Sequence, residues 1–155
     1  MIALAGLTAC SASNSVGPDG GLVPTVRVLF IGNSYTSVND LPSVVVKLGE
    51  ATQSPVRFEV AQHTPGGQTW AGQDADAEVD QLIQQGWDVV VLQDQSDQPW
   101  LAGGGSASLI SLDAKIKATG ASTVLYMTWA KRADLAARVG ISRFEQDLDA
   151  NRYYQ

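Results

Sequence analysis

Apolar residues along this chain fall into short runs separated by amphipathic stretches. Four runs have the composition of strands: residues 26–31, 56–61, 87–92 and 122–128. The segment from Val89 to Leu92 is apolar throughout, which is typical of a strand covered on both faces. Gly32 directly follows the first run and marks the point where that strand is expected to end.

The stretches between and after these strands have helical patterns. Residues 42–52 begin with a proline, which suits a first helical turn, and they place apolar residues on one face. Asp74 is expected to cap a second helix that ends at Gly86. Residues 106–120 predict a third helix and residues 134–154 a last one.

This order of elements predicts the fold class. Strands that alternate with helices of about 10–15 residues indicate βαβ units and a parallel sheet. The chain should therefore form a three-layer α/β/α sandwich with a flavodoxin-like order of elements. Ligands bind such sheets at the carboxyl ends of the strands. Because the predicted order ends on a helix, we expect the fold to be truncated at its C-terminus.

Composition narrows the class of function. The chain has 155 residues, which suits one domain, and 45% of them are hydrophobic. Its net charge is −6 and it contains no run of Lys or Arg, so it is a poor candidate for binding nucleic acid. One cysteine excludes an internal disulfide framework. We expect no cofactor, and Asp94 and Asp97 are interpreted as solvated carboxylates rather than metal ligands.

The N-terminus carries a possible export signal. Residues 7–10, Leu-Thr-Ala-Cys, resemble a bacterial lipobox, and residues 11–24 are rich in Ser, Gly and Pro, as flexible linkers are. We therefore predict a lipoprotein signal remnant and linker over residues 1–24, followed by a domain over residues 25–155. The protein would then be exported and membrane-anchored through Cys10. The alternative is a disordered leader, because no basic residue precedes the cysteine.

Three polar loops follow three of the predicted strands. The first contains Ser34, whose hydroxyl and backbone N–H should face the crevice at the end of the sheet. The second contains Gly67, where a glycine permits close approach of the backbone to a ligand. The third contains Gln95, whose side-chain amide is a donor. Three donors around one point are typical of an oxyanion hole.

These loops resemble the sequence blocks of the SGNH (GDSL-like) serine hydrolases. Gly-Asn-Ser-Tyr-Thr at residues 32–36 is similar to the first block, which holds the nucleophile. Residues 39–42, 89–96 and 126–129 are similar to further motifs of an uncharacterised bacterial branch of this superfamily. The resemblance implies an SGNH-type α/β/α domain that hydrolyses esters. Ser34 would be the nucleophile, and Gly67 and Gln95 would bind the oxyanion.

Three departures from the superfamily pattern matter. Asn33 replaces the usual Asp beside the nucleophile, and Gln95 replaces an Asn. In the superfamily a late Asp-x-x-His block supplies the acid and base of the triad. This sequence has no counterpart of that block, and His63 is its single histidine. A serine hydroxyl needs an adjacent base. We therefore interpret residues 25–155 as a C-terminally incomplete domain, inactive or very weakly active as it stands.

Each candidate residue also has a plainer interpretation. Ser34 would be an ordinary helix cap, Gly67 a turn glycine and Gln95 a strand cap. His63 is interpreted as a surface or packing residue in preference to a substitute base, and Asp40 as a turn residue in preference to the triad acid. Among the tryptophans, Trp100 and Trp129 are the better candidates for a substrate pocket, whereas Trp70 and Trp87 are expected in the core or as loop anchors.

Two functions follow from these interpretations. The first is an exported esterase that acts on acylated small molecules or carbohydrates, with carbohydrate deacetylation implied only by the resemblance. The second is a non-catalytic, lipid-anchored relative that binds a glycan or another ligand in the same crevice. A flavodoxin-like phosphate site is disfavoured, because the first loop lacks a glycine-rich cradle.

Overall fold

The computed structural model describes residues 15–16, 21–96, 98 and 106–128. A four-stranded sheet forms its centre, in the order β4-β3-β5-β6, and every pairing in that sheet is parallel. The strands are β3 (Thr25–Ile31), β4 (Arg57–His63), β5 (Val89–Leu92) and β6 (Ser122–Leu125). All four predicted strands are confirmed, although β6 is shorter than the predicted residues 122–128.

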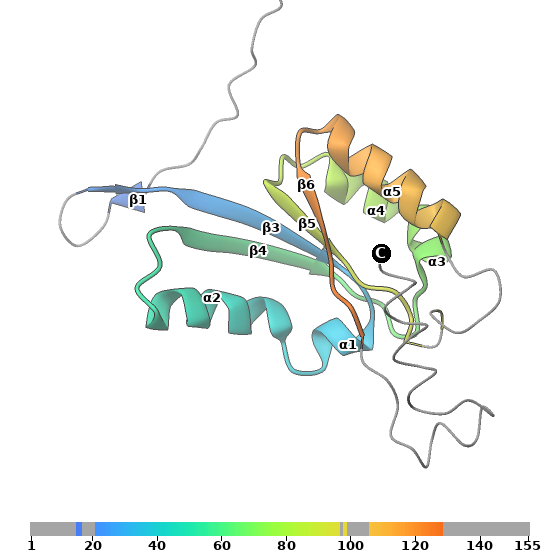
Figure 1. Ribbon diagram of the computed structural model, residues 1–155, viewed down its shortest axis with the longest axis horizontal. Coiled ribbons are helices and arrows are strands. Elements are labelled where there is room, and N and C mark those ends of the chain that lie inside the picture. The colour runs from blue at the N-terminus through green and yellow to red at the C-terminus, as the bar shows by residue number, and fades with distance from the viewer. Residues whose placement is uncertain (1–14, 17–20, 97, 99–105, 129–155) are drawn as a thin grey trace, which may run out of the picture.

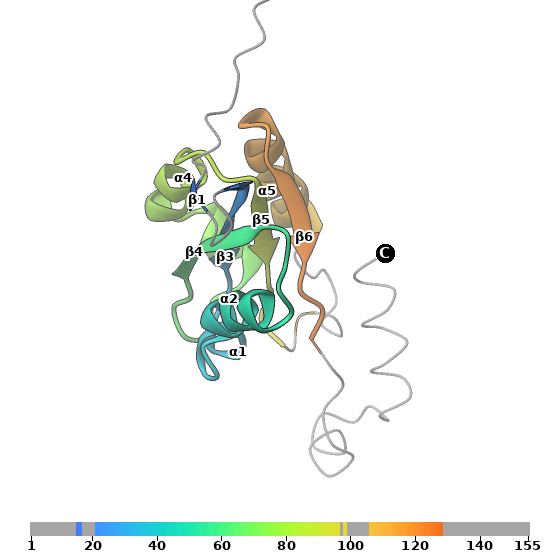
Figure 2. The same cartoon turned by 90° about the vertical axis from the view of Figure 1, so that its left-hand side faces the viewer.

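The helices cover both faces of this sheet, as Figures 1 and 2 show. One face carries α1 (Ser34–Ser37) and α2 (Leu41–Ala51). The other carries α3 (Trp70–Asp74), α4 (Ala77–Ile83) and α5 (Ser106–Ala118). The predicted three-layer α/β/α sandwich is therefore confirmed. The chain reverses its direction of travel across the sheet between β4 and β5, so the carboxyl ends of β3 and β5 flank the topological switch point.

The main core lies between the sheet and the helices α3–α5. Alternate residues of β3 and β5 point into it, among them Leu29 and Leu92, both fully buried. Fully buried residues of the helices pack against them: Trp70, Val79, Ile83, Leu112 and Ile116. The spacing of four residues within α4 and within α5 belongs to the amphipathic pattern from which these helices were predicted. Trp70 and Trp87 both belong to this core, as expected.

The structure corrects one helix prediction. Residues 70–83 form two short helices, and the cap of α4 is Asp76, whose side chain accepts a hydrogen bond from the Glu78 N–H at 2.9 Å. Asp74 is not that cap, because its carboxylate instead accepts from Ser111 Oγ at 2.8 Å and from Lys115. Caps cannot be assigned by type alone when two aspartates lie two residues apart.

Two short strands lie within the stretch predicted as a flexible linker. They are β1 (Ser15–Val16) and β2 (Leu22–Val23), which pair antiparallel. Several sequence predictions lie outside the described residues: the lipidated Cys10, the tryptophans Trp100 and Trp129, Asp97 and the helix over residues 134–154. Within the described residues, no helix is long and apolar enough to cross a membrane.

A charge cluster on α3, α4 and α5 should contribute to stability in a pH-dependent way. Lys115 Nζ lies 2.9 Å from Asp74 Oδ1 and 2.8 Å from Asp80 Oδ1. Burial raises the pKa of Asp74, but hydrogen bonds from Lys115 and Ser111 outweigh it and hold that pKa below 3.8. Hydrogen bonding to Asp80 raises the pKa of Lys115 above 10.5.

Replacing Lys115 with methionine should therefore destabilise the protein by about 1 kcal/mol at neutral pH. The depressed pKa of Asp74 stabilises the fold above pH 3.8, and that contribution is lost as pH falls through the folded-state pKa. The raised pKa of Lys115 adds stability that is lost only as pH rises above 10.5. Denaturant unfolding at several pH values should show the lower free energy of unfolding near pH 7 and a smaller difference from the wild type in acid.

Lys117→Met, which removes an exposed ion pair with Asp113 on α5, is the matched control, and its free energy of unfolding should change little. Equal deficits in the two variants would contradict this account.

Candidate functional site

Three loops meet at the carboxyl edge of the sheet. The first loop is residues 32–36, after β3, and it runs into α1. The second loop is residues 64–69, between β4 and α3, and the third loop is residues 93–96, after β5. Because β3, β4 and β5 are parallel neighbours, their carboxyl ends lie on one side of the sheet. The structure therefore brings the loops of Ser34, Gly67 and Gln95 to one edge, as the sequence predicted.

Asn33 organises the first loop. It is the N-cap of α1, and its Oδ1 accepts a hydrogen bond from the Tyr35 N–H at 3.1 Å. Its Nδ2 donates to the backbone carbonyl of Gln68 at 2.9 Å, which ties the first loop to the second. Ser34 is therefore the first residue of the helix and not its cap, so that plainer interpretation is wrong.

Ser34 keeps its polar groups available. The residue is half-buried, and within the described part of the chain neither its Oγ nor its N–H makes a hydrogen bond to protein. Asn33 accepts hydrogen bonds from the N–H groups of Tyr35, Thr36 and Ser37, so among the N–H groups at the start of α1 it is the Ser34 N–H that can donate to a ligand. This N–H lies at the positive end of the peptide dipoles, which favours an anion, although α1 is a single turn.

Gln93 holds the first loop to the third. Its side chain is almost fully buried, at 1% exposure, and its Oε1 accepts from the Asn33 N–H and the Thr36 hydroxyl, each at 3.0 Å. Its Nε2 donates to the carbonyl of Asp94. Gly32 packs so closely here that an added Cβ would lie 2.5 Å from Thr36 Oγ1 and 2.8 Å from Gln93 Oε1. The sequence analysis missed Gln93, although a glutamine directly after a buried strand was a usable signal.

Gly67 has the conformation that only glycine adopts easily. Its φ is +72°, in the left-handed region, and the Gln68 N–H closes a turn onto the Pro65 carbonyl at 3.4 Å. Within the described residues, the Gly67 N–H donates no hydrogen bond to protein. Gly67 is exposed, and both of its predicted roles, a turn glycine and an oxyanion donor, are compatible with this geometry.

Asp94 joins the third loop to the start of α3, directly after the second loop. Its carboxylate is fully buried, and Oδ1 accepts from the backbone N–H groups of Trp70 and Gln95, both at 2.8 Å. Gln95 is half-buried, and its carbonyl accepts from the Gln98 N–H at 3.0 Å. The prediction that Asp94 is a solvated carboxylate is therefore wrong, because its buried oxygen is used to fix the backbone of two segments. Among the described residues, no group of three His, Cys, Asp or Glu side chains is arranged to hold a metal ion.

His63 is held away from the role of a base. It ends β4, and its Nε2 lies 3.1 Å from Asp76 Oδ2 while its Nδ1 lies 3.7 Å from Glu78 Oε1. The side chain is only 10% exposed. Both ring nitrogens face carboxylates on and before α4, which favours the packing interpretation. Asp40 is exposed, with φ +49° at the start of α2, as a turn residue would be.

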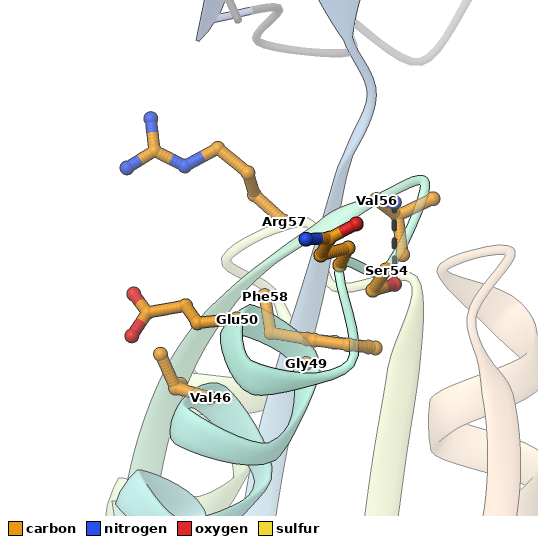
Figure 3. A pocket seen from close by; sticks show the side chains of 8 residues that line it. Val46, Gly49, Glu50, Ser54, Val56, Arg57 and Phe58 are labelled. Carbon is orange, nitrogen blue, oxygen red and sulfur yellow. Dashed lines mark hydrogen bonds between the residues drawn. The ribbon is translucent and has the colours of Figure 1, made fainter. Parts of the chain in front are cut away.

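A groove of about 710 Å³ lies at the opposite end of the sheet. It runs between the end of α2 and the start of β4, and Figure 3 shows the Phe58 ring lying over Gly49 in its wall, with Glu50 and Arg57 extending to the other side. None of the three loops contributes to it. This groove therefore lies apart from the three polar loops that the sequence indicated as the candidate site.

Comparison with solved structures identifies the fold. TesA matches with a TM-score of 0.59 and 20% sequence identity, over 83% of this chain and 70% of TesA. The psychrotrophic esterase EstA from Pseudoalteromonas sp., in a structure inhibited by monoethylphosphonate, matches with a TM-score of 0.56 and 15% identity, over 83% and 69%. No family model and no curated protein sequence matches the chain. These likenesses show that the chain shares its fold with TesA and with this esterase, which is the α/β/α arrangement that the sequence predicted.

Proposed function

We propose that this protein is an SGNH-type ester hydrolase in which Ser34 is the nucleophile. The observation that carries the proposal is the hydrogen-bonded joining of the three loops around Ser34. Asn33 bonds to the second loop and to Gln93, and Asp94 bonds to Trp70, the residue directly after the second loop, and to Gln95. Such buried, satisfied networks fix loop geometry, and fixed donors are what an oxyanion hole requires.

The proposed chemistry is acyl transfer through a covalent intermediate. Ser34 Oγ attacks the ester carbonyl carbon as its proton passes to a base, and the carbonyl oxygen becomes an oxyanion. The N–H groups of Ser34 and Gly67 and the Gln95 amide donate to that oxygen. The C–O bond to the alcohol then breaks, the alcohol leaves with a proton, and water hydrolyses the acyl-serine by the same route.

Turnover by this chain is expected to be very slow. A serine hydroxyl is a weak nucleophile unless a base accepts its proton. The chain has a single histidine, His63, and that imidazole faces Asp76 and Glu78. The proposed oxyanion donors alone would still accelerate attack on an activated substrate, since such donors remain effective when triad members are missing.

The substrate class and location are finer parts of the proposal. We take the substrate to be an acylated small molecule or carbohydrate, with removal of acetyl groups from carbohydrate as the particular reaction. EstA, which shares the fold, is an esterase by its description. Export and lipid anchoring through Cys10 are proposed from the lipobox-like residues 7–10, which would place the enzyme at a bacterial membrane surface.

Covalent capture tests the proposal. Incubation with an alkyl fluorophosphonate for hours, followed by intact-mass measurement and peptide mapping, should give one adduct, located on Ser34. The phosphonate adduct on the serine is tetrahedral at phosphorus, like the intermediate of ester hydrolysis, and its phosphoryl oxygen takes the place of the oxyanion, so it uses the same donors as the reaction does. An adduct distributed over exposed serines would contradict the proposal.

A second candidate is supported by the pairing of His63 away from the site. The protein would then be a non-catalytic binder of a glycan in the same crevice. It predicts no adduct on Ser34 together with measurable binding of an acetylated xylo-oligosaccharide in calorimetry. Capture of Ser34 by the phosphonate would exclude this candidate in favour of the hydrolase.

A further inference from the structure

Gln73 bridges the two strands that lead into the site. It lies on α3, is fully buried, and was not among the residues that the sequence indicated. Its Nε2 donates to the backbone carbonyl of Gly32 at 3.1 Å and to that of Gln93 at 3.3 Å. These two carbonyls belong to the first residues after β3 and β5, respectively.

The bridge lies where the sheet can no longer hold the strands together. The last paired residues are Ile31 and Leu92, and one more backbone bond, from the Gln93 N–H to the Ile31 carbonyl, follows at 2.9 Å. Beyond this bond the segments that follow β3 and β5 continue into the first and third loops. Gln73 Nε2 then binds one carbonyl from each segment, so it fixes the separation of the two segments at the switch point.

The proposed nucleophile and side-chain donor lie at equal distances along the chain from the Gly32 and Gln93 carbonyls. Ser34 lies two residues after Gly32, and Gln95 lies two residues after Gln93. Any change in the spacing of the two carbonyls therefore moves the nucleophile relative to the side-chain donor. Reacting and stabilising groups need near-ideal placement, and a displacement of about 1 Å can lower a rate by as much as 100-fold.

Packing alone does not explain an amide at this position. Gln73 Oε1 is buried and has no hydrogen-bond partner among the described residues. A buried acceptor without a partner costs free energy, and an apolar side chain of similar volume would avoid that cost. The side chain therefore carries a stability penalty while its Nε2 makes two bonds to the loops.

We propose that Gln73 is a positioning residue that sets the distance between Ser34 and Gln95. This inference rests on the proposed ester hydrolysis. It assigns Gln73 no contact with substrate, because its two donor hydrogens are used by Gly32 and Gln93. Its effect should appear in the rate of the chemical step and not in substrate binding.

Gln73→Met tests this with a side chain of similar volume. We expect a somewhat lower melting temperature, because methionine fills the space but leaves the carbonyls of Gly32 and Gln93 without this donor, so rates are measured well below the unfolding transition. The rate of Ser34 phosphonylation and kcat for p-nitrophenyl acetate should fall about 10- to 100-fold, with KM little changed. Gln81→Met, on an exposed position of α4, is the control and should leave both rates unchanged. A wild-type kcat and phosphonylation rate in Gln73→Met, or a change in KM with kcat unchanged, would overturn the inference.

Gln73→Glu provides an independent readout in case the methionine variant folds poorly. Burial raises the pKa of the introduced carboxyl, whose protonated form keeps one donor and whose ionised form has none. The ratio of its phosphonylation rate to that of the wild type should therefore be highest in acid and fall as pH rises. Using the ratio cancels titrations common to both proteins. A flat ratio would overturn the inference, whereas absence of capture in the wild type would overturn the proposed function itself.

Discussion

Replacing Ser34 with alanine is expected to abolish covalent capture by the fluorophosphonate. Hydrolysis of p-nitrophenyl acetate should fall to the buffer rate, a loss on the order of 100-fold or more if the donors act as proposed. The reason is that the adduct forms on Ser34 Oγ and no neighbouring hydroxyl shares its place at the start of α1. Labelling yield by mass spectrometry and initial rates of nitrophenol release measure the two effects.

Ser37→Ala is the matched control for this experiment. Ser37 is the last residue of the same helical turn and is half-buried like Ser34. Its backbone N–H bonds to the Asn33 carbonyl at 3.2 Å, which alanine preserves. We expect wild-type labelling from this variant. If Ser34→Ala retained the adduct while Ser37→Ala lost it, the assignment of the nucleophile would be wrong.

Replacing Gly32 with alanine should both destabilise the protein and impair the site. The new Cβ would lie 2.5 Å from Thr36 Oγ1 and 2.8 Å from Gln93 Oε1, well inside contact distance. The Thr36 hydroxyl donates to the side-chain Oε1 of Gln93, and both side chains are buried. They cannot separate without breaking that bond, so we expect a loss of about 1–3 kcal/mol in the free energy of unfolding.

The control is Gly66→Ala in the second loop. An added Cβ at Gly66 meets nothing within 4 Å, so the free energy of unfolding should change by less than about 0.5 kcal/mol. Urea unfolding of both variants, with phosphonylation rates measured on the folded proteins, separates stability from reactivity. Equal stability of the two variants would show that the site relaxes around the extra methyl group, contrary to the packing described here.

Local sequence determined the elements and the edge where the loops meet. Buried strands are recognisable because they are continuously apolar, as in Val89–Leu92, and helices because their apolar residues recur every three or four positions. Gly32 and Gly67 were recognisable as points of sharp turning. From these alone the α/β/α class and the loops of Ser34, Gly67 and Gln95 follow, since parallel strands bring their carboxyl ends to one edge.

The tertiary structure decided which polar residues hold those loops together. Asn33, not Ser34, caps α1, because the Asn33 side chain is the one that accepts from the Tyr35 N–H. Asp76, not Asp74, caps α4, because the Asp74 carboxylate is bonded to Ser111 and Lys115 on the distant helix α5. Gln73 was not identifiable from the sequence, and although the position of Gln93 directly after a buried strand was a usable signal, its bonding partners were not. Their partners lie 20 to 60 residues away in sequence, and a buried amide looks like any other glutamine until the fold sets two carbonyls beside it.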